Sequence, residues 1–210
     1  DMLVTNRLSV SASVFLNNGD GTFVARVNYT TGTNPWSIAT SDVDGDGKPD
    51  MLVANSSSNT ASVLINNGDG TYATKVDYTT GTTPQSITSS DVNGDGKPDM
   101  LVANNSSSTI SVFINTSSTT LSFASKVDYT TGASPYTITT SDVNGDGKLD
   151  MLVTNRLSVS ASVFLNNGDG TFVARVNYTT GTNPWSIATS DVDGDGKPDM
   201  LVANSSSNTA

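Results

Sequence analysis

Four stretches of the sequence have the form D-x-[DN]-x-D-G-x-x-D, which places oxygen-bearing side chains at alternate positions of a short loop. In the first stretch, residues 42–50, carboxylates fall at positions 1, 3, 5 and 9, and Lys48 at position 7 offers its backbone carbonyl. Ca²⁺ binds roughly six to eight such oxygens at ~2.3 to 2.6 Å. Gly47 at position 6 permits the sharp turn that wraps the chain around one ion. The spacing therefore predicts a calcium site in each stretch.

The predicted ligands occupy positions 1, 3, 5, 7 and 9 of each loop, and the lysine at position 7 contributes only its carbonyl oxygen. They are Asp42, Asp44, Asp46, Lys48 and Asp50 in the first loop; Asp91, Asn93, Asp95, Lys97 and Asp99 in the second; Asp142, Asn144, Asp146, Lys148 and Asp150 in the third; and Asp191, Asp193, Asp195, Lys197 and Asp199 in the fourth. Asp1 matches the ninth position of a further loop and cannot hold an ion by itself. Asn at position 3 keeps an oxygen but removes a charge, so we expect weaker binding in the second and third loops.

Other interpretations fit the loops less well. An EF-hand needs a bidentate Glu at position 12, where these stretches have Val53, Val102, Val153 and Val202. Mg²⁺ prefers fewer protein ligands in strict octahedral geometry, which makes it a weaker alternative. Asp and Gly are also common in plain turns, but four copies at nearly constant spacing favour a metal site.

The loops recur with a period of about 50 residues, since their first aspartates are 49, 51 and 49 residues apart. Residues 1–61 also recur without a change as residues 150–210, a shift of 149 residues or three modules. This repetition indicates either a recent duplication or a longer periodic polymer. We expect one continuous array over residues 1–210, with partial modules at 1–32 and 182–210 and complete modules at 33–81, 82–132 and 133–181.

Each module has the pattern of four short strands. In the module at 33–81, we expect strands over residues 36–43, 51–54, 61–66 and 71–78. The second is a continuous apolar run, which is typical of a strand covered on both faces. The last two are joined by Asn67-Gly68-Asp69-Gly70, a hairpin signal because consecutive positive-φ positions suit these residues. The predicted metal loop therefore connects the first strand to the second.

Composition narrows the range of functions. All twenty acidic residues are Asp, and the chain has no His, no Cys and a formal charge of -10. Its ten Lys and Arg residues form no patch, which excludes a nucleic-acid partner. No apolar run approaches the ~20 residues that span a bilayer. Because His, Cys and Glu are absent and the paired aspartates belong to closed metal loops, we expect no enzymatic activity.

Residues 42–72 resemble the FG-GAP/VCBS repeat of integrin α-subunit-type β-propellers and of many bacterial surface proteins; they read D-V-D-G-D-G-K-P-D-M-L-V-A-N-S-S-S-N-T-A-S-V-L-I-N-N-G-D-G-T-Y. The resemblance covers essentially the whole chain. It implies an all-β fold of tandem four-stranded antiparallel blades of the β-propeller type, with Ca²⁺ between the first two strands. The expected strand count is 17, one more than four closed blades need. A closed ring and an open superhelical array are therefore both retained.

We predict an extracellular or cell-surface structural repeat protein, which Ca²⁺ at about one ion per module stiffens into a filament, stalk or adhesin scaffold. Its expected partners are calcium, neighbouring repeats and other copies of itself, with a surface glycan or protein as a further candidate. The alternative is a closed β-propeller that binds a glycan or protein within a larger secreted or surface protein. A calcium-dependent hydrolase is the least favoured interpretation.

Overall fold

The computed structural model describes residues 1–207 and contains no helix in that range, so none there is long and apolar enough to cross a membrane. The predicted partial module at 182–210 extends beyond these residues. The predicted number of strands is confirmed. The strands are β1 (Met2–Asn6), β2 (Ser11–Phe15), β3 (Val27–Thr30), β4 (Pro35–Ser41), β5 (Asp50–Asn55), β6 (Thr60–Leu64), β7 (Val76–Thr79), β8 (Pro84–Ser90), β9 (Asp99–Asn104), β10 (Thr109–Phe113), β11 (Val127–Thr130), β12 (Pro135–Ser141), β13 (Asp150–Asn155), β14 (Ser160–Phe164), β15 (Val176–Thr179), β16 (Pro184–Ser190) and β17 (Asp199–Asn204).

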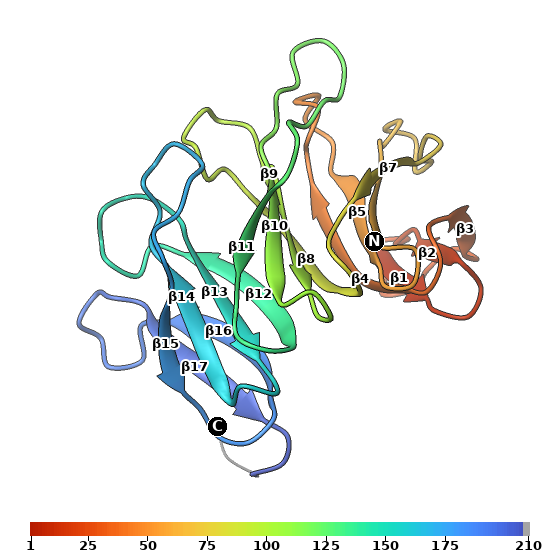
Figure 1. Ribbon diagram of the computed structural model, residues 1–210. Coiled ribbons are helices and arrows are strands. Elements are labelled where there is room, and N and C mark those ends of the chain that lie inside the picture. The colour runs from red at the N-terminus through yellow and green to blue at the C-terminus, as the bar shows by residue number, and fades with distance from the viewer. Residues whose placement is uncertain (208–210) are drawn as a thin grey trace.

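The strands form antiparallel sheets in which each strand pairs with its neighbours in sequence (Figure 1). The strand orders β4-β5-β6-β7, β8-β9-β10-β11 and β12-β13-β14-β15 give three complete blades in the described part of the chain. A three-stranded sheet, β1-β2-β3, precedes them, and a two-stranded sheet, β16-β17, follows them. Short connections produce this arrangement, because antiparallel neighbours need only a hairpin between them. The all-β fold of tandem four-stranded antiparallel blades is therefore confirmed.

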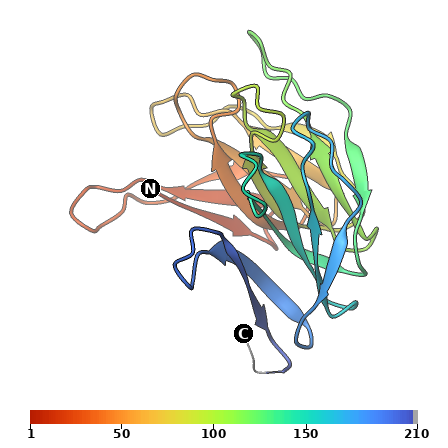
Figure 2. The ribbon, with the colours of Figure 1, turned by 90° about the vertical axis from the view of Figure 1, so that its left-hand side faces the viewer.

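The first strands of successive blades lie side by side near a common axis. β4 contacts β8, β8 contacts β12, and β12 contacts β16. From this axis the blades fan out into an arc (Figure 2). Within residues 1–207 the first and last sheets share no paired strands, so the described residues form no closed ring.

The second strand of each complete blade forms the core of the array. β5, β9 and β13 are buried at every position. Both faces are covered because each blade packs against the next, and Leu101 of one blade shares a hydrophobic cluster with Met151 of its neighbour. Full burial of such a side chain contributes about 1.5 to 3 kcal/mol. Each blade is therefore stabilised chiefly by its two neighbours, as in other repeat proteins.

The fourth strand is shorter than the sequence predicts. In the blade of β4–β7, residues 71–78 contain only an isolated bridge at Tyr72 and the start of β7. The sequence predicts consecutive positive-φ residues in the turn of residues 67–70, and this detail is wrong. Only Gly68 and Gly70 have positive φ values, 84° and 85°, and the residue between them does not. The chain therefore leaves the ladder at the hairpin. It places the ring of Tyr72 edge-on against Tyr29 of the preceding blade, with 5.3 Å between centroids.

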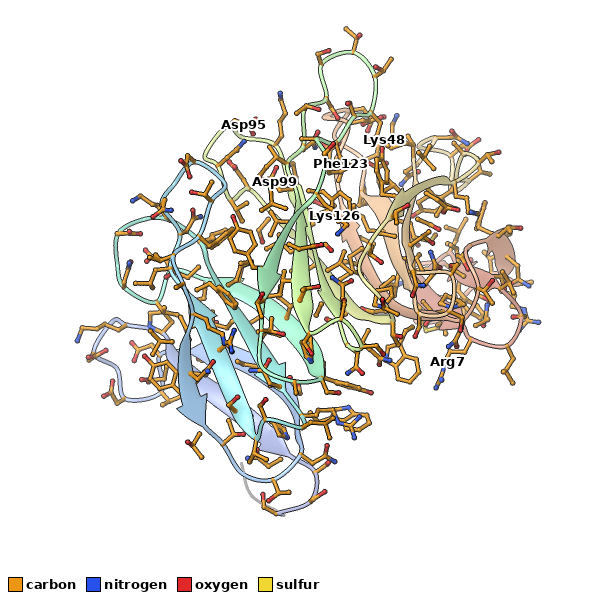
Figure 3. All side chains as sticks on the ribbon, viewed as in Figure 1. Arg7, Lys48, Asp95, Asp99, Phe123 and Lys126 are labelled. Atoms are coloured by element: carbon orange, nitrogen blue, oxygen red, sulfur yellow. The ribbon has the colours of Figure 1, made fainter. Side chains whose placement is uncertain are left out.

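Aromatic and arginine side chains fill the space between blades at the end of the axis away from the metal loops, where Arg7 lies (Figure 3). Arg7 lies 3.6 Å from the ring centroid of Trp36, and Arg156 lies 4.7 Å from that of Trp185. Tyr136 contacts both tryptophans, with centroid distances of 6.4 and 4.4 Å. Stacked guanidinium groups and offset rings are favourable at such distances. This cluster therefore packs the blades together.

The turn between the second and third strands holds its last residue in the left-handed region. Asn59 and Ser108 take this place in two blades, with φ of 56° and 54°. Val10 and Val159 take it in two others, with φ of 53° and 50°. A β-branched residue is strained there, at a cost on the order of 1 kcal/mol or more. Equivalent turns of different blades are therefore strained where this residue is Val and relaxed where it is Asn or Ser.

Val159→Asn is expected to raise the free energy of unfolding by about 1 kcal/mol, because Asn tolerates this conformation. Its side-chain oxygen can also accept a hydrogen bond, as that of Asn59 does from the N–H of Thr83 at 2.8 Å. Urea unfolding followed by circular dichroism measures the change. Asn59→Val is the matched reverse and should lower stability. If neither variant differs from the parent chain, strain at this turn is negligible.

Candidate metal centres

The first metal loop joins β4 to β5. Pairing of Ser41 with Asp50 across the two strands brings the ends of the loop together. Gly45 and Gly47 take φ values of 80° and 85°, which a residue with a Cβ adopts only with strain. These turns fold the loop back on itself, while Val43 at position 2 enters the core with 1% exposure. The side chains at positions 1, 3 and 9 are thereby left on the loop's inner side.

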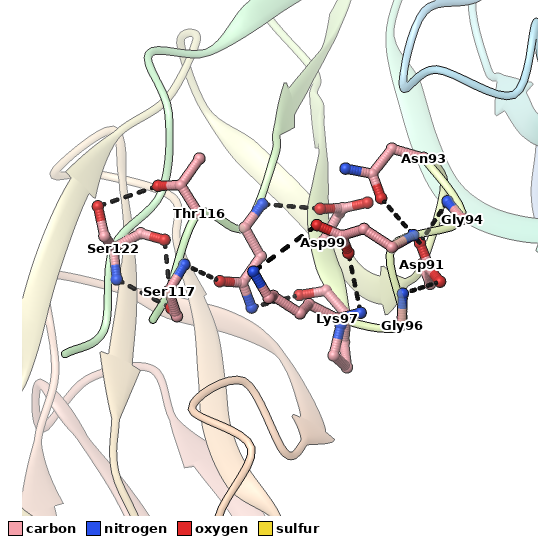
Figure 4. Close-up of polar contacts among 12 residues, drawn as sticks. Asp91, Asn93, Gly94, Gly96, Lys97, Asp99, Thr116, Ser117 and Ser122 are labelled. Carbon is pink, nitrogen blue, oxygen red and sulfur yellow. Dashed lines mark hydrogen bonds and ion pairs between the residues drawn. The ribbon is translucent and has the colours of Figure 1, made fainter. Parts of the chain in front are cut away.

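The carboxylate at position 1 organises each loop. Oδ1 of Asp42 accepts hydrogen bonds from the N–H groups of Gly45 and Asp46 at 2.8 and 3.0 Å, and Oδ2 accepts one from Gly47 at 2.8 Å. Figure 4 shows the same arrangement in the loop of residues 91–99. Backbone amides thus set the turn, and Oδ2, which accepts only one of these bonds, keeps a lone pair for a further partner. The equivalent residues are Asp91, Asp142 and Asp191.

Position 9 anchors the loop to the blade. Asp50 is fully buried, and it accepts hydrogen bonds from the N–H groups of Val43 at 2.9 Å and Asn66 at 2.8 Å. Burial raises the pKa of Asp50; the two amide hydrogen bonds oppose this change, and the carboxylates at positions 1 and 3 add to it. The negative charge is therefore poorly compensated by the protein, and a bound cation would offset it. The other anchors that accept the position-2 N–H are Asp99, Asp150 and Asp199.

Three carboxylates of the first loop converge closely enough to share one ion. Ligand oxygens of Asp42, Asp44 and Asp50 lie within 4.8 Å of one another. Oxygens that bind one Ca²⁺ at ~2.4 Å can be at most ~4.8 Å apart, so the cluster fits the ion. Hard carboxylate oxygens favour such a cation over softer transition metals. These loops could therefore hold a metal ion, and a second cluster within the same limit consists of Asp191, Asp193 and Asp195.

The carboxylate at position 5 faces the lysine at position 7. Asp46 accepts hydrogen bonds from the backbone N–H of Lys48 at 2.9 Å and from its ammonium group at 2.6 Å. This ion pair is exposed, so its contribution to stability is small. The carbonyl ligand at position 7 stays a prediction. The corresponding ammonium-to-carboxylate distances are 3.9 Å for Lys97 and Asp95, 3.4 Å for Lys148 and Asp146, and 2.6 Å for Lys197 and Asp195.

The loops with Asn at position 3 keep the geometry of the others. Oδ1 of Asn93 accepts the N–H of position 5 at 3.0 Å, as does Oδ1 of Asn144. These loops therefore differ from the first loop in charge more than in shape. Asp1 occupies the place of a ninth position, because its Oδ1 accepts the N–H of Asn17 at 2.9 Å.

Sequence reasoning missed the asparagine that opens each outer hairpin. Asn66 donates its N–H to Asp50, and its side-chain amide donates to the carbonyl of Pro49 at 3.0 Å. Asn115 and Asn166 stand in the same place and are buried, with 1% and 4% exposure. A signal was present in the sequence, since an asparagine follows Asp1, Asp50, Asp99 and Asp150 by 16 residues.

The combination of metal loop and hairpin recurs in the same register from blade to blade. The sequence profile described as FG-GAP-like repeat matches residues 1–53, 42–102, 91–153 and 142–202. The chain belongs to this family. In this FG-GAP-like chain, each matched segment ends just after a metal loop, and the next segment begins at the first residue of that same loop. Consecutive matches therefore overlap. A search of curated proteins gave no match.

The FG-GAP-like chain also resembles several solved structures. A putative 6-phosphogluconolactonase from Bacteroides uniformis has a TM-score of 0.65 and 18% identity, covering 96% of this chain and 62% of that one. An auxiliary nutrient binding protein from Bacteroides ovatus has a TM-score of 0.58 and 14% identity, covering 88% and 49%. The V. cholerae biofilm matrix protein Bap1 has a TM-score of 0.52 and 16% identity, covering 93% and 34%.

At these identities the likeness concerns the fold alone. The chain spans less than two thirds of the length of each of the three proteins. Repeats and fold together show a tandem array of FG-GAP-like β-blades.

Asp50→Asn is expected to destabilise the chain by about 1 to 3 kcal/mol, because an NH2 group would then face one of two buried N–H donors. Asp44→Asn copies the residue that two other loops carry at position 3, so it should change stability by less than ~0.5 kcal/mol. Urea unfolding in the presence of EDTA measures both changes. Equal effects of the two substitutions would contradict the anchoring role of position 9.

Proposed function

We propose that this chain is a calcium-binding structural repeat segment, with about one Ca²⁺ in each complete loop. The observation that carries the proposal is the convergence of Asp42, Asp44 and Asp50, whose ligand oxygens lie within 4.8 Å of one another. Like charges at this distance repel, most strongly where one of them is buried. A divalent cation would convert that repulsion into attraction, so binding should stabilise the folded loop. Membership of the FG-GAP-like family supports the same metal.

The position of the loops indicates what the ions would do. Each loop closes the end of the pair formed by the first two strands, and the second of these is the buried core strand. An ion that fixes the conformation of the loop would therefore also fix the position of the blade's central strand. Because blades are stabilised by their neighbours, ordered loops would stiffen the array along its length. We propose a filament, stalk or adhesin scaffold whose partners are calcium, adjacent repeats and further copies of the chain.

The proposed location is extracellular or on the cell surface, where Ca²⁺ is abundant enough to fill sites of modest affinity. One protein of similar fold is a biofilm matrix protein. The proposal includes no catalytic role, because the loop aspartates are held in closed turns and the chain has no His, Cys or Glu.

Calcium is expected to raise the melting temperature of the chain, and EDTA should reverse the change. At a Ca²⁺ concentration of about 100 times Kd, each filled loop adds roughly 2.7 kcal/mol to the free energy of unfolding. Differential scanning calorimetry measures the shift, with Mg²⁺ at equal concentration for comparison. A variant with Ala at position 3 of all four loops is the control and should respond less. Identical melting in Ca²⁺ and in EDTA would refute the proposal.

Asn93→Asp is expected to tighten Ca²⁺ binding in its loop, on the order of tenfold, because affinity rises with the number of ligand charges. The turn should not change, since Asp44 makes the same contact with the N–H of position 5, at 3.2 Å. Isothermal titration calorimetry measures the affinities. Asp44→Asn is the reverse substitution and should weaken the first loop. An unchanged affinity in both variants would show that position 3 is not a ligand.

A further inference from the structure

Each outer hairpin in the middle of the array contacts two metal loops. Asn115 donates its backbone N–H to Oδ1 of Asp99 at 2.7 Å, and its Nδ2 donates to the carbonyl of Pro98 at 3.0 Å. Both contacts lie within its own blade. The same Nδ2 also donates to the carbonyl of Val43 in the preceding blade, at 2.8 Å. Val43 is position 2 of the first loop and stands between two predicted ligands, so one buried side chain joins loops 91–99 and 42–50.

The same bridge joins the next pair of loops. Asn166 donates its N–H to Asp150 at 2.8 Å and its Nδ2 to the carbonyl of Leu149 at 2.9 Å. Its Nδ2 also donates to the carbonyl of Val92 in the preceding loop, at 2.9 Å. The two bridges form a continuous series of contacts from loop 142–150 through loop 91–99 to loop 42–50.

The orientation of both bridging amides is determined by a further contact. Oδ1 of Asn115 accepts the N–H of Ser117 at 2.9 Å, and Oδ1 of Asn166 accepts that of Gly168 at 2.7 Å. Only an oxygen can accept these bonds, so the NH2 group of each side chain must face the loop carbonyls. Donation to two carbonyls then uses both of its hydrogens. The bridge is therefore fully satisfied in this one arrangement.

We propose that Asn115 and Asn166 are positioning residues that couple neighbouring calcium loops, so that occupancy of one loop raises the affinity of the loop in the preceding blade. The inference rests on the proposed calcium function. Asp99 held in place by a cation would hold the N–H of Asn115, and Asn115 would then hold the carbonyl of Val43. A loop ordered in advance loses less conformational freedom when it binds its own ion. Calcium would thus fill the array cooperatively.

Asn66 provides the comparison within the chain. It makes the same contacts with its own loop, to Asp50 and Pro49, and it stands in the blade that follows Asp1. Within the described residues the Nδ2 of Asn66 donates to the carbonyl of Pro49, in its own loop, and it takes no part in the bridge between loops 91–99 and 42–50. Substituting it removes contacts within a loop and leaves the contact between loops 91–99 and 42–50 in place.

The test follows Ca²⁺ binding at loop 42–50 alone, in the full 210-residue chain. The amide groups of Gly45 and Gly47 donate to Asp42 inside this loop, so their NMR resonances report its occupancy during a Ca²⁺ titration. Asn93→Ala with Asp95→Ala blocks the neighbouring loop, and neither residue is part of the bridge. We expect the Kd of loop 42–50 to rise by about fivefold or more when loop 91–99 is blocked.

The bridge itself is tested by a double-mutant cycle. Asn115→Ala should weaken loop 42–50, and blocking loop 91–99 in that variant should cause no further loss. In the Asn66→Ala control, blocking loop 91–99 should still raise the Kd of loop 42–50. Asn166→Ala, followed through the amides of Gly94 and Gly96, repeats the test at the second bridge. If Asn115→Ala does not fold, the Asn166→Ala measurement decides whether the bridging asparagine couples the two loops.

The outcomes separate the coupling from the calcium function. If no concentration of Ca²⁺ shifts the resonances of Gly45 and Gly47, both the proposed function and the coupling are wrong. If they shift with the same Kd whether or not loop 91–99 is blocked, the coupling alone is wrong. If coupling persists in both Asn→Ala bridge variants, the asparagines do not carry it.

Discussion

The buried carboxylate at the ninth loop position is the contact on which the rest of each blade depends. Asp50 is the first residue of β5, and β5 is buried along its whole length. The same carboxylate accepts one N–H from the metal loop and one from the outer hairpin. Strand, loop and hairpin therefore meet at a single side chain. Its burial is tolerated because backbone amides satisfy it, and a cation beside it would add further compensation.

The packing between blades gives this contact an effect beyond one module. Hydrophobic clusters contain side chains from neighbouring blades, as Leu101 and Met151 show, so no blade forms a complete core alone. Near the metal loops, buried asparagines cross the same boundary through hydrogen bonds. At the opposite end of the blades, stacked arginine and aromatic side chains cross two other boundaries, between the first two sheets and between the last two. Hydrophobic clusters cross all four boundaries within the described residues, and each boundary also has either an asparagine bridge or an arginine stack. The array rather than the blade is therefore the unit of stability.

The two ends of the blades differ in chemistry. One end carries the aspartate-rich loops, and the other, where Arg7 lies (Figure 3), carries turns without aspartate. Arg7 and Arg156 stack on aromatic rings there. Metal would act only at the first end, where carboxylates converge at the base of the strands. The other end is held by contacts that need no ion. Such a division suits a scaffold in which packing forms the blades and ions adjust their stiffness.

Much of this protein could be predicted from the sequence, because the relevant interactions are local. A nine-residue loop contains its own predicted ligands and glycine turns, and a buried strand such as β5 is recognisable from its continuous apolar run. The family and the order of strands follow from the same repeated pattern. The predicted ligand at position 7 and the identity of the metal remain predictions.

Tertiary structure decided what depends on residues far apart in the chain. It brought Asp50 back to Asp42 and Asp44, because the pairing of β4 with β5 returns position 9 to the loop's start. It shortened the fourth strand, since the ring of Tyr72 packs on the neighbouring blade. It also brought Asn115 against Val43, which lies 72 residues earlier. No local pattern encodes that contact, because it exists only once two blades have packed side by side.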